Sequence, residues 1–208
     1  MKSILFFLGV AVSAIVILVP ALATAVPPNA SIGYALVDGS YAEWNTTADF
    51  FSDMFRAGKP DKPLESKLYL RYDCTTATMY ALVLCEPDVP GYIDPTATTA
   101  WIAIDAQNNK VVDERSGNSI PPDPPDFAWV GQGYDGNLQH VQGYEASFRI
   151  LLGTYRIIAH IDVWDGVPVS VQTSATPGFP KEGPDLVVPN CQTAVESTSW
   201  GVIKALYR

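Results

Sequence analysis

The sequence has little of the chemistry that builds metal centres and nucleophilic active sites. Its 208 residues include only 2 histidines and 3 cysteines, which leaves little material for a zinc site held by the protein. It contains no G-x-S-x-G, no H-E-x-x-H and no phosphate-binding glycine loop. Positive charge is also scarce, with 13 Lys and Arg against 22 Asp and Glu. Affinity for nucleic acid comes mainly from cations that neutralise phosphates, so we expect no nucleic-acid partner.

The chain is instead largely apolar. Hydrophobic residues make up 48% of it and charged residues 17%, a composition that excludes disorder throughout. A chain of this length is typical of one domain, with or without a short tail. We therefore expect a folded, acidic, single-domain protein.

The N-terminal residues have the order of a secretory signal peptide. Lys2 is followed by an apolar run over residues 4–19, then by Pro20 and the small residues of Ala23-Thr24-Ala25. An uncleaved anchor is the alternative, because residues 4–26 could span a bilayer. Pro20 and the small residues at the expected cleavage site favour cleavage by signal peptidase, so we expect residues 1–25 to be removed. The mature protein would then be extracellular or at the cell surface, with no membrane span.

Export would place the three cysteines where disulfides persist. Cys74 and Cys85 lie at opposite ends of one expected hairpin, too far apart for the short Cβ–Cβ distance of a bridge. We therefore predict a Cys74–Cys191 disulfide and leave Cys85 as a buried thiol. Asn29 and Asn45 begin glycosylation sequons, which matter only if the host glycosylates.

Most of the chain alternates between apolar and polar residues with a period of two, as β-strands do. In residues 144–150 this places Tyr144, Ala146 and Phe148 inward and Glu145 outward. In residues 67–73 it places Leu68, Leu70 and Tyr72 on one face and Tyr69 on the other. Short strands separated by Gly, Pro and Asn turns predict an all-β, antiparallel β-sandwich, jelly-roll-like, over residues 26–192. The expected strands cover residues 67–73, 79–85, 101–105, 111–112, 127–130, 144–150, 155–164 and 169–172.

Two segments have the spacing of helices. Residues 48–57 carry apolar side chains four residues apart and end at Gly58, which predicts a short helix. In the tail, residues 193–208, a second short helix would carry Trp200, Ile203 and Tyr207 along one stripe. This tail either packs on the sandwich or serves as a sorting or interaction tag.

The order of four motifs resembles a known group of domains. Val37-Asp38-Gly39-x-x-x-Glu43-Trp44 opens the domain, residues 68–73 pair with residues 79–83, residues 101–105 end in Asp, and Gly143-Tyr144-Glu145 begins a further strand. This order resembles the family 9 carbohydrate-binding modules and the related DOMON haem- or sugar-binding domains. The resemblance implies a β-sandwich that binds sugars, with calcium in some members.

Sugar recognition needs flat aromatic faces beside a few fixed polar groups. Trp129 and Tyr134 flank Gly131-Gln132-Gly133, and Trp164 shares a strand face with His160 and Asp162. The large rings either fill the core or present a platform for sugar. The predicted carbohydrate-binding residues are Trp129, Trp164, Tyr134, Asp162, His160 and Gln132.

Other sites have weaker support in the sequence. Asp105, Asn108 and Asn109 offer oxygen ligands of the kind calcium uses, although a hairpin turn explains them equally. Haem is not expected, because packing explains Met54 and Met79. Glu145, Asp162 and Asp105 could form the carboxylate pair of a glycosidase, but exposed strand carboxylates usually serve solubility.

These patterns favour a secreted, non-catalytic module that binds glycans at a cell surface or in a matrix. The alternative is a structural or adhesive extracellular subunit that binds a protein partner through a sheet edge or the C-terminal tail.

Overall fold

The computed structural model describes residues 29–59, 61–117, 124–164, 171–188 and 190–191. Within these residues the chain forms strands and no helix, which confirms the predicted all-β class. The strands are β1 (Ser31–Ile32), β2 (Phe50–Arg56), β3 (Leu64–Asp73), β4 (Thr78–Cys85), β5 (Gly91–Tyr92), β6 (Ala100–Ile104), β7 (Lys110–Asp113), β8 (Asp126–Val130), β9 (His140–Val141), β10 (Gly143–Arg149), β11 (Gly153–Trp164), β12 (Val171–Ala175) and β13 (Asp185–Val188).

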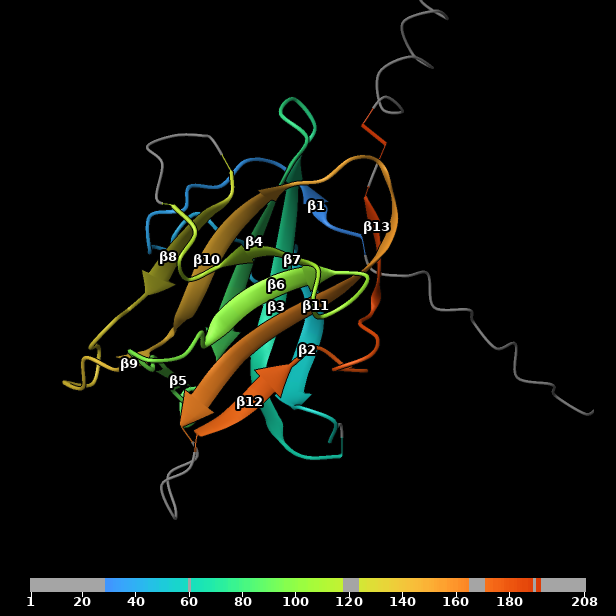
Figure 1. The fold of residues 1–208 in the computed structure, drawn as a ribbon. Helices are drawn as coiled ribbons and strands as arrows, with labels where there is room; N and C mark the ends of the chain where they lie inside the picture. The colour runs from blue at the N-terminus through green and yellow to red at the C-terminus, as the bar shows by residue number, and fades with distance from the viewer. Residues whose placement is uncertain (1–28, 60, 118–123, 165–170, 189, 192–208) are drawn as a thin grey trace, which may run out of the picture.

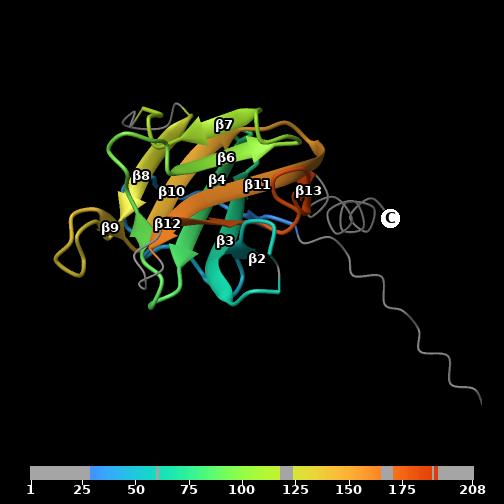
Figure 2. The same ribbon diagram turned by 60° about the horizontal axis from the view of Figure 1, so that its bottom comes forward.

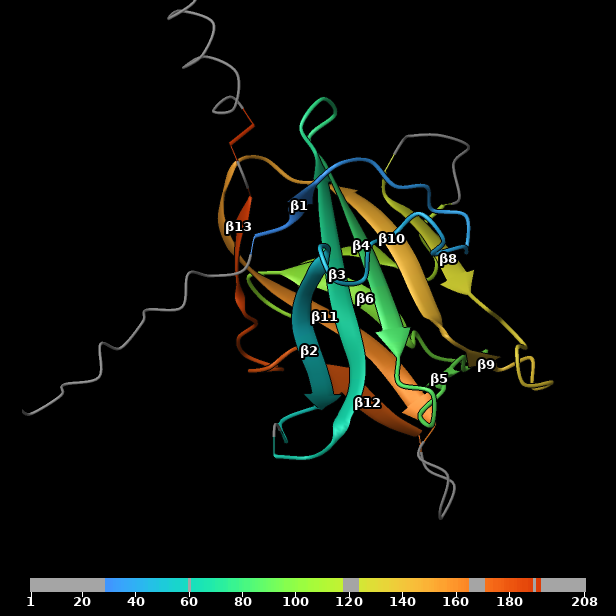
Figure 3. The same cartoon turned by 180° about the vertical axis from the view of Figure 1, so that it is seen from behind.

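One nearly closed sheet folds into two facing layers. Its hydrogen-bonded order is β7-β6-β11-β12-β2-β3-β4-β10-β8. We call β7, β6, β11 and β12 the front layer and β2, β3, β4, β10 and β8 the back layer (Figures 1 and 3). The layers are joined where β12 pairs with the end of β2 over two residue pairs. All pairings along this path are antiparallel, which is compatible with the predicted sandwich.

The main hydrophobic core lies between the two layers, whose strands Figure 2 shows from a second direction. The alternation in the sequence is confirmed here, because Tyr144 and Phe148 of β10 and Ile157 and Ile161 of β11 are all buried in it. Strand residues two apart point to the same face, so one face of each strand supplies this core. Its other large buried members are Leu68, Leu70, Tyr72, Met54, Met79, Ile102 and Leu186.

The N-terminal segment that follows β1, residues 33–49, covers the outer face of the back layer (Figure 3). Its Ala35 and Trp44 pack against Tyr69, Tyr80 and Leu82 and form a second hydrophobic cluster. Tyr69 is therefore buried, although it lies on the face opposite Leu68 and Leu70. Alternation correctly assigned this residue to the outer face, but that face is covered by another part of the chain.

Glu145, which alternation places outward, does lie on this outer face, but its side chain is fully buried under the N-terminal segment. Its Oε1 accepts a hydrogen bond from Trp44 Nε1 at 2.8 Å, and its Oε2 accepts bonds from the backbone N–H of Gly39 at 2.9 Å and Asp38 at 3.2 Å. Burial raises the pKa of the Glu145 carboxyl to about 7, while these three donors favour the ionised form. The Asp38-Gly39 and Glu43-Trp44 motifs are thus hydrogen-bonded to the carboxyl of the Gly143-Tyr144-Glu145 motif.

The predicted helix over residues 48–57 is wrong, because residues 50–56 form β2. The register of β2 against β3 shifts between Phe50 and Ser52 and again between Met54 and Phe55. A β-bulge interrupts the two-residue alternation. As a result Phe51 and Met54, three residues apart, both enter the core. The helix was predicted from apolar residues four apart, such as Phe51 and Phe55, but Phe51 is buried whereas Phe55 is only half-buried.

The Cys74–Cys191 disulfide is present, and Cys85 is a free thiol whose pKa is raised by burial to about 12. The expected signal peptide, residues 1–25, and the expected tail helix within residues 193–208 lie outside the described residues. In the part of the chain that the structure describes, no helix has the length and apolar character needed to cross a bilayer.

Candidate functional site

A hollow of about 220 Å³ lies where β4 ends and β10 begins. Two of the residues that line it are tyrosines with substantially exposed side chains, Tyr41 at 39% and Tyr134 at 44%. Exposed aromatic rings beside a concave surface are the feature that sugar sites require. We call this the tyrosine hollow; it is lined by Tyr41, Leu84, Cys85, Glu86, Pro87, Tyr134 and Gln142.

Tyr134 reaches the tyrosine hollow through a turn that depends on glycine. Gly131 and Gly133 have φ angles of 62° and 73°, in the left-handed region that favours glycine. A Cβ on Gly131 would also lie 2.5 Å from Gln142 Oε1. The turn is closed by hydrogen bonds from Tyr134 N to Gly131 O and from Gly133 N to His140 O. Because Gly131 has no Cβ, the Gln142 amide can occupy this space.

The tyrosine hollow offers both hydrogen-bond donors and hydrogen-bond acceptors. Among the described residues the Gln142 side chain makes no hydrogen bond, so its amide can both donate and accept. Glu86 pairs with Lys67, and this hydrogen bond raises the pKa of the lysine. Burial raises the pKa of Tyr134, so its hydroxyl is a neutral donor near neutral pH. Together these groups match the donors and acceptors of sugar hydroxyls.

An aromatic cluster brings together one residue from each of β5, β9 and β11. The rings of Tyr92 and Trp164 stack with centroids 5.4 Å apart, and His140 lies 5.5 Å from Trp164. Asp135 Oδ2 is 2.6 Å from His140 Nδ1, and this bond lowers the pKa of Asp135. His140 Nε2 is buried and has no partner within the described residues. Since Tyr92 covers one indole face, a sugar could stack only on the remainder of Trp164.

The predicted group of Trp164, Asp162 and His160 shares the outer face of β11, as alternation required. His160 stacks on Trp101, with ring centroids 4.7 Å apart and 11° between the planes, and it is buried. Its Nε2 lies 3.4 Å from Asp162 Oδ1, which also accepts a bond from Thr173 Oγ1. Burial lowers the pKa of His160 to about 4 and raises that of Asp162 to about 6. His160 is thus neutral at pH 7 and covered by its neighbours.

The other predicted sugar-binding residues lie apart from this group. Trp129 is half-buried against the main core, where its ring meets Phe127 edge-on at 82°. Gln132 donates from Nε2 to Leu138 O at 3.0 Å, which closes the loop that carries Tyr134. Of the six predicted residues, Tyr134 alone lines the tyrosine hollow.

The residues predicted for calcium take part in the turn between β6 and β7. Asp105 Oδ1 accepts a hydrogen bond from Arg156 N at 2.9 Å, and Asn109 Nδ2 donates to Ile104 O at 2.8 Å. Asn108 adjoins them in the same turn. The described residues hold no group of three His, Cys, Asp or Glu placed for a metal ion. Calcium at Asp105, Asn108 and Asn109 stays a prediction.

Of the carboxylates considered for catalysis, Glu145 and Asp162 do not converge. Glu145 is buried under the N-terminal segment on the back layer, whereas Asp162 lies on the outer face of the front layer. The main core separates the two strands that carry them. Met54 and Met79 lie in that core, where packing accounts for them as expected.

The sequence indicated only Tyr134 of the tyrosine hollow; among the residues it missed, those with polar groups are Tyr41, Glu86 and Gln142. Tyr41 belongs to the N-terminal segment and meets β4 only because that segment folds over the back layer. Glu86 and Gln142 directly follow and precede strands, a position at which polar side chains gather around loop-built sites. That position was the only available signal for them.

No protein-family model matches the chain, and no curated protein matches it significantly. A solved structure that resembles it is a family 9 carbohydrate-binding module from Caldicellulosiruptor kristjanssonii in complex with glucose. The two chains are 13% identical, with a TM-score of 0.44, and the match covers 81% of this chain and 98% of the other. The likeness is loose and concerns the overall arrangement of strands.

Proposed function

We propose that this protein binds carbohydrate without catalysis and that one sugar ring occupies the tyrosine hollow. The observation that carries the proposal is the pair of exposed rings, Tyr41 and Tyr134, that line one concavity together with the Gln142 amide and the Glu86 carboxylate. The C–H face of a sugar ring would pack on a tyrosine face, and its hydroxyls would bond to the amide and the carboxylate.

The size of the hollow limits what it accepts. Sites for drug-sized molecules usually enclose roughly 300–1,000 Å³, whereas this hollow encloses about 220 Å³. One sugar ring is therefore a better match than a longer stretch of polysaccharide. The rest of a glycan would extend into solvent.

Secretion is part of the proposal. The signal-like N-terminus motivates it, and the Cys74–Cys191 disulfide supports it, because such bonds persist mainly outside the cytosol. The ligand would then be a glycan of a cell surface or matrix. Detection of the mature chain in the medium, beginning near residue 26, would test this directly.

The binding proposal is tested by screening the purified protein on a glycan array and measuring the affinity of each hit by calorimetry. Tyr134→Ala and Tyr41→Ala should each remove a stacking face worth about 1–2 kcal/mol, which weakens binding about five- to thirtyfold. Tyr34→Ala is the matched control, because Tyr34 is 47% exposed and lies outside the hollow. Its affinity should equal that of the parent protein.

A third variant separates the tyrosine hollow from the tryptophan cluster that the sequence favoured. Trp164→Ala removes the indole that stacks on Tyr92 and leaves the hollow intact. Loss of sugar binding in Trp164→Ala, with both tyrosine variants unaffected, would place the site on the outer face of β11. An array without hits would count against carbohydrate binding itself.

A further inference from the structure

A second hollow, of about 290 Å³, lies beside the Cys74–Cys191 disulfide. Its lining comes from the end of β3, the turn between β3 and β4, the connection between β10 and β11, and the residues after β13. It shares no residue with the tyrosine hollow. We call it the leucine hollow; it is lined by Tyr72, Cys74, Ala77, Leu151, Leu152, Asn190 and Cys191.

Exposed aliphatic side chains gather at the leucine hollow. Within the described residues, the large apolar side chains that are more than half exposed are Leu138, Leu151, Ile32 and Leu152. Leu151, at 73%, and Leu152, at 56%, line the hollow, and Ile32, at 61%, pairs in register with Tyr72 of its wall. Soluble proteins rarely leave a contiguous apolar patch exposed, and such a patch usually marks a contact. The leucine hollow is therefore a surface that another segment or molecule would cover.

Hydrogen bonds fix the two leucines in this position. Ile150 N donates to Ala77 O at 3.1 Å, and Tyr72 Oη donates to Ile150 O at 3.2 Å. On the other side β11 begins at Gly153, which pairs with Val188 of β13. The backbone is held directly before Leu151 and directly after Leu152, so their exposure belongs to the folded chain.

The segment that follows the disulfide has the side chains to cover this surface. Residues 193–208 begin two positions after Cys191, which itself lines the leucine hollow, and they contain Trp200, Ile203 and Tyr207. The stretch from Cys191 to Trp200 can extend over about 30 Å, more than the width of a hollow of this volume. A segment tethered so closely has an effective concentration of the order of millimolar. It therefore competes well against a second copy of the chain.

Charge favours the same contact. The chain carries a net charge of −9, whereas residues 193–208 contain Lys204 and Arg208 against the single acidic residue Glu196. A basic segment is attracted to an acidic body. The lining of the leucine hollow contains no lysine or arginine that would oppose it.

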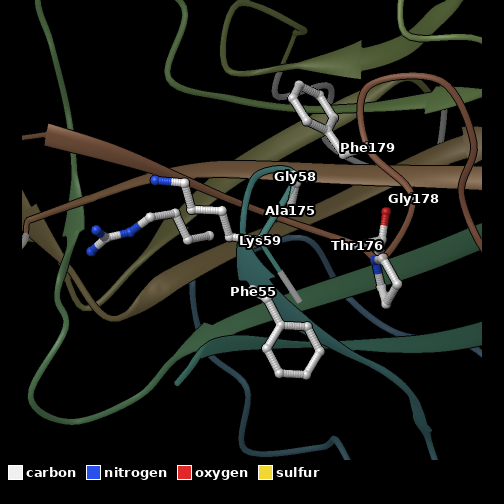
Figure 4. A pocket seen from close by; sticks show the side chains of 9 residues that line it. Phe55, Gly58, Lys59, Ala175, Thr176, Gly178 and Phe179 are labelled. Atoms are coloured by element: carbon white, nitrogen blue, oxygen red, sulfur yellow. The ribbon is translucent and has the colours of Figure 1, made fainter. Parts of the chain in front are cut away.

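The hollow between the end of β2 and the turn after β12 is a poorer match for this segment. It measures about 230 Å³, and Figure 4 shows Phe55 and Phe179 among the side chains along it. Lys59 also lines it and is exposed, so an approaching basic segment would meet a like charge.

We propose that residues 193–208 dock on the leucine hollow of their own chain, with the Trp200 ring against Leu151 and Leu152. Removal of these leucines and the indole from water supplies the free energy of docking. The volume lies just below the roughly 300–1,000 Å³ of small-molecule sites, which suits one large side chain. Of the two uses that the sequence left open for this segment, the proposal selects packing on the sandwich. It is independent of sugar binding at the tyrosine hollow.

The test is ¹⁹F NMR of the purified protein labelled with 5-fluorotryptophan. The protein has five tryptophans, and the signal lost in Trp200→Phe is that of Trp200. In the parent protein this signal should differ from its position in urea. The double variant Leu151→Ser/Leu152→Ser should move it to the urea position and leave the four other signals in place, which shows that the fold is intact.

Trypsin gives an independent readout, since it cleaves after Lys204. The rate of this cleavage should rise about tenfold in Leu151→Ser/Leu152→Ser, because the loss of apolar contacts releases the segment. Leu138→Ser is the matched control: Leu138 is 76% exposed and lies outside the leucine hollow, so neither the rate nor the Trp200 signal should change.

Two results would overturn the proposal whether or not sugar binds near Tyr134. One is a Trp200 signal that already lies at the urea position in the parent protein, or that the double variant leaves unmoved. The other is a Trp200 signal that reverts to the urea position on dilution by about a hundredfold. A tethered contact survives such dilution, so reversion would assign the leucine hollow to a second copy of the chain.

Discussion

Replacing Glu145 with glutamine should change how the stability of the protein depends on pH. The Glu145 carboxyl is 0% exposed and holds Trp44 and the 38–39 turn by three hydrogen bonds. Burial raises its pKa from 4.5 to about 7. Between these two values the folded protein keeps a proton that the unfolded chain has lost. The free energy of unfolding therefore falls as pH rises through this window.

The size of the effect follows from the shift in pKa. A difference of one pKa unit corresponds to about 1.4 kcal/mol, so the shift of Glu145 corresponds to about 3 kcal/mol. This contribution is complete below pH 4.5 and is lost as pH rises through about 7. The amide that Glu145→Gln introduces cannot titrate, so the variant lacks this contribution at every pH.

Urea unfolding of both proteins, followed by tryptophan fluorescence between pH 4 and 8, measures the effect. The useful quantity is the difference between the variant and the parent at each pH, because other groups titrate in the same range. Because the pKa of His160 is lowered from 6.5 to about 4, the free energy of unfolding rises with pH between these values. Because the pKa of Asp162 is raised from 3.8 to about 6, the free energy of unfolding falls with pH between those values. Both contributions are common to the two proteins and cancel in the difference.

From pH 4.5 to 7.5 the difference should move by about 3 kcal/mol in favour of Glu145→Gln, on top of a constant loss from the altered hydrogen bonds. Glu182→Gln is the control, because that side chain is 66% exposed, and its difference from the parent should be flat. A difference for Glu145→Gln that stays constant to within about 1 kcal/mol would refute the conclusion that burial dominates the ionisation of this carboxyl.

Two further predictions concern the disulfide and the glycine turn. The Cys74–Cys191 disulfide restricts the unfolded chain by joining residues 117 positions apart. Its reduction, or its removal by Cys74→Ser, should therefore lower the free energy of unfolding by about 4–5 kcal/mol. An unchanged urea midpoint under reducing conditions would contradict this. Gly131→Ala should cost about 1–2 kcal/mol of backbone strain and also weaken sugar binding, because its Cβ would displace the Gln142 amide. Gly136→Ala meets the same strain at a φ of 89° with no atom within 4 Å, so sugar affinity should survive in this variant, as calorimetry can show.

Strand positions were predictable wherever one face of a strand meets the main core. In β10 and β11 every second residue is apolar, and those residues are the ones buried between the layers. In β2 the same reasoning failed, because the bulge around Phe51 removed the two-residue alternation on which it depends. The short strands β5 and β9 and the later strand β13 were not predicted, since few residues in each show any period.

The residues of the candidate site were predictable only in part. Tyr134 was identified because an aromatic residue in a glycine-rich turn is a local feature. Tyr41 and Gln142 lie about a hundred residues apart in the sequence and line the same hollow. Sequence spacing contains no information about such a contact until the sheet and its covering segment are in place.

The sequence by itself determined the all-β class, the inward faces of the regular strands and the pairing of Cys74 with Cys191. These features depend on side-chain period and on the separation of residues along a strand, both of which are local. The tertiary structure decided what covers the outer face of the back layer. The docking of residues 33–49 buries Tyr69 and Glu145 and brings Tyr41 to the tyrosine hollow. Alternation along a strand specifies two faces, but it does not specify whether water or another segment of the chain meets the second one.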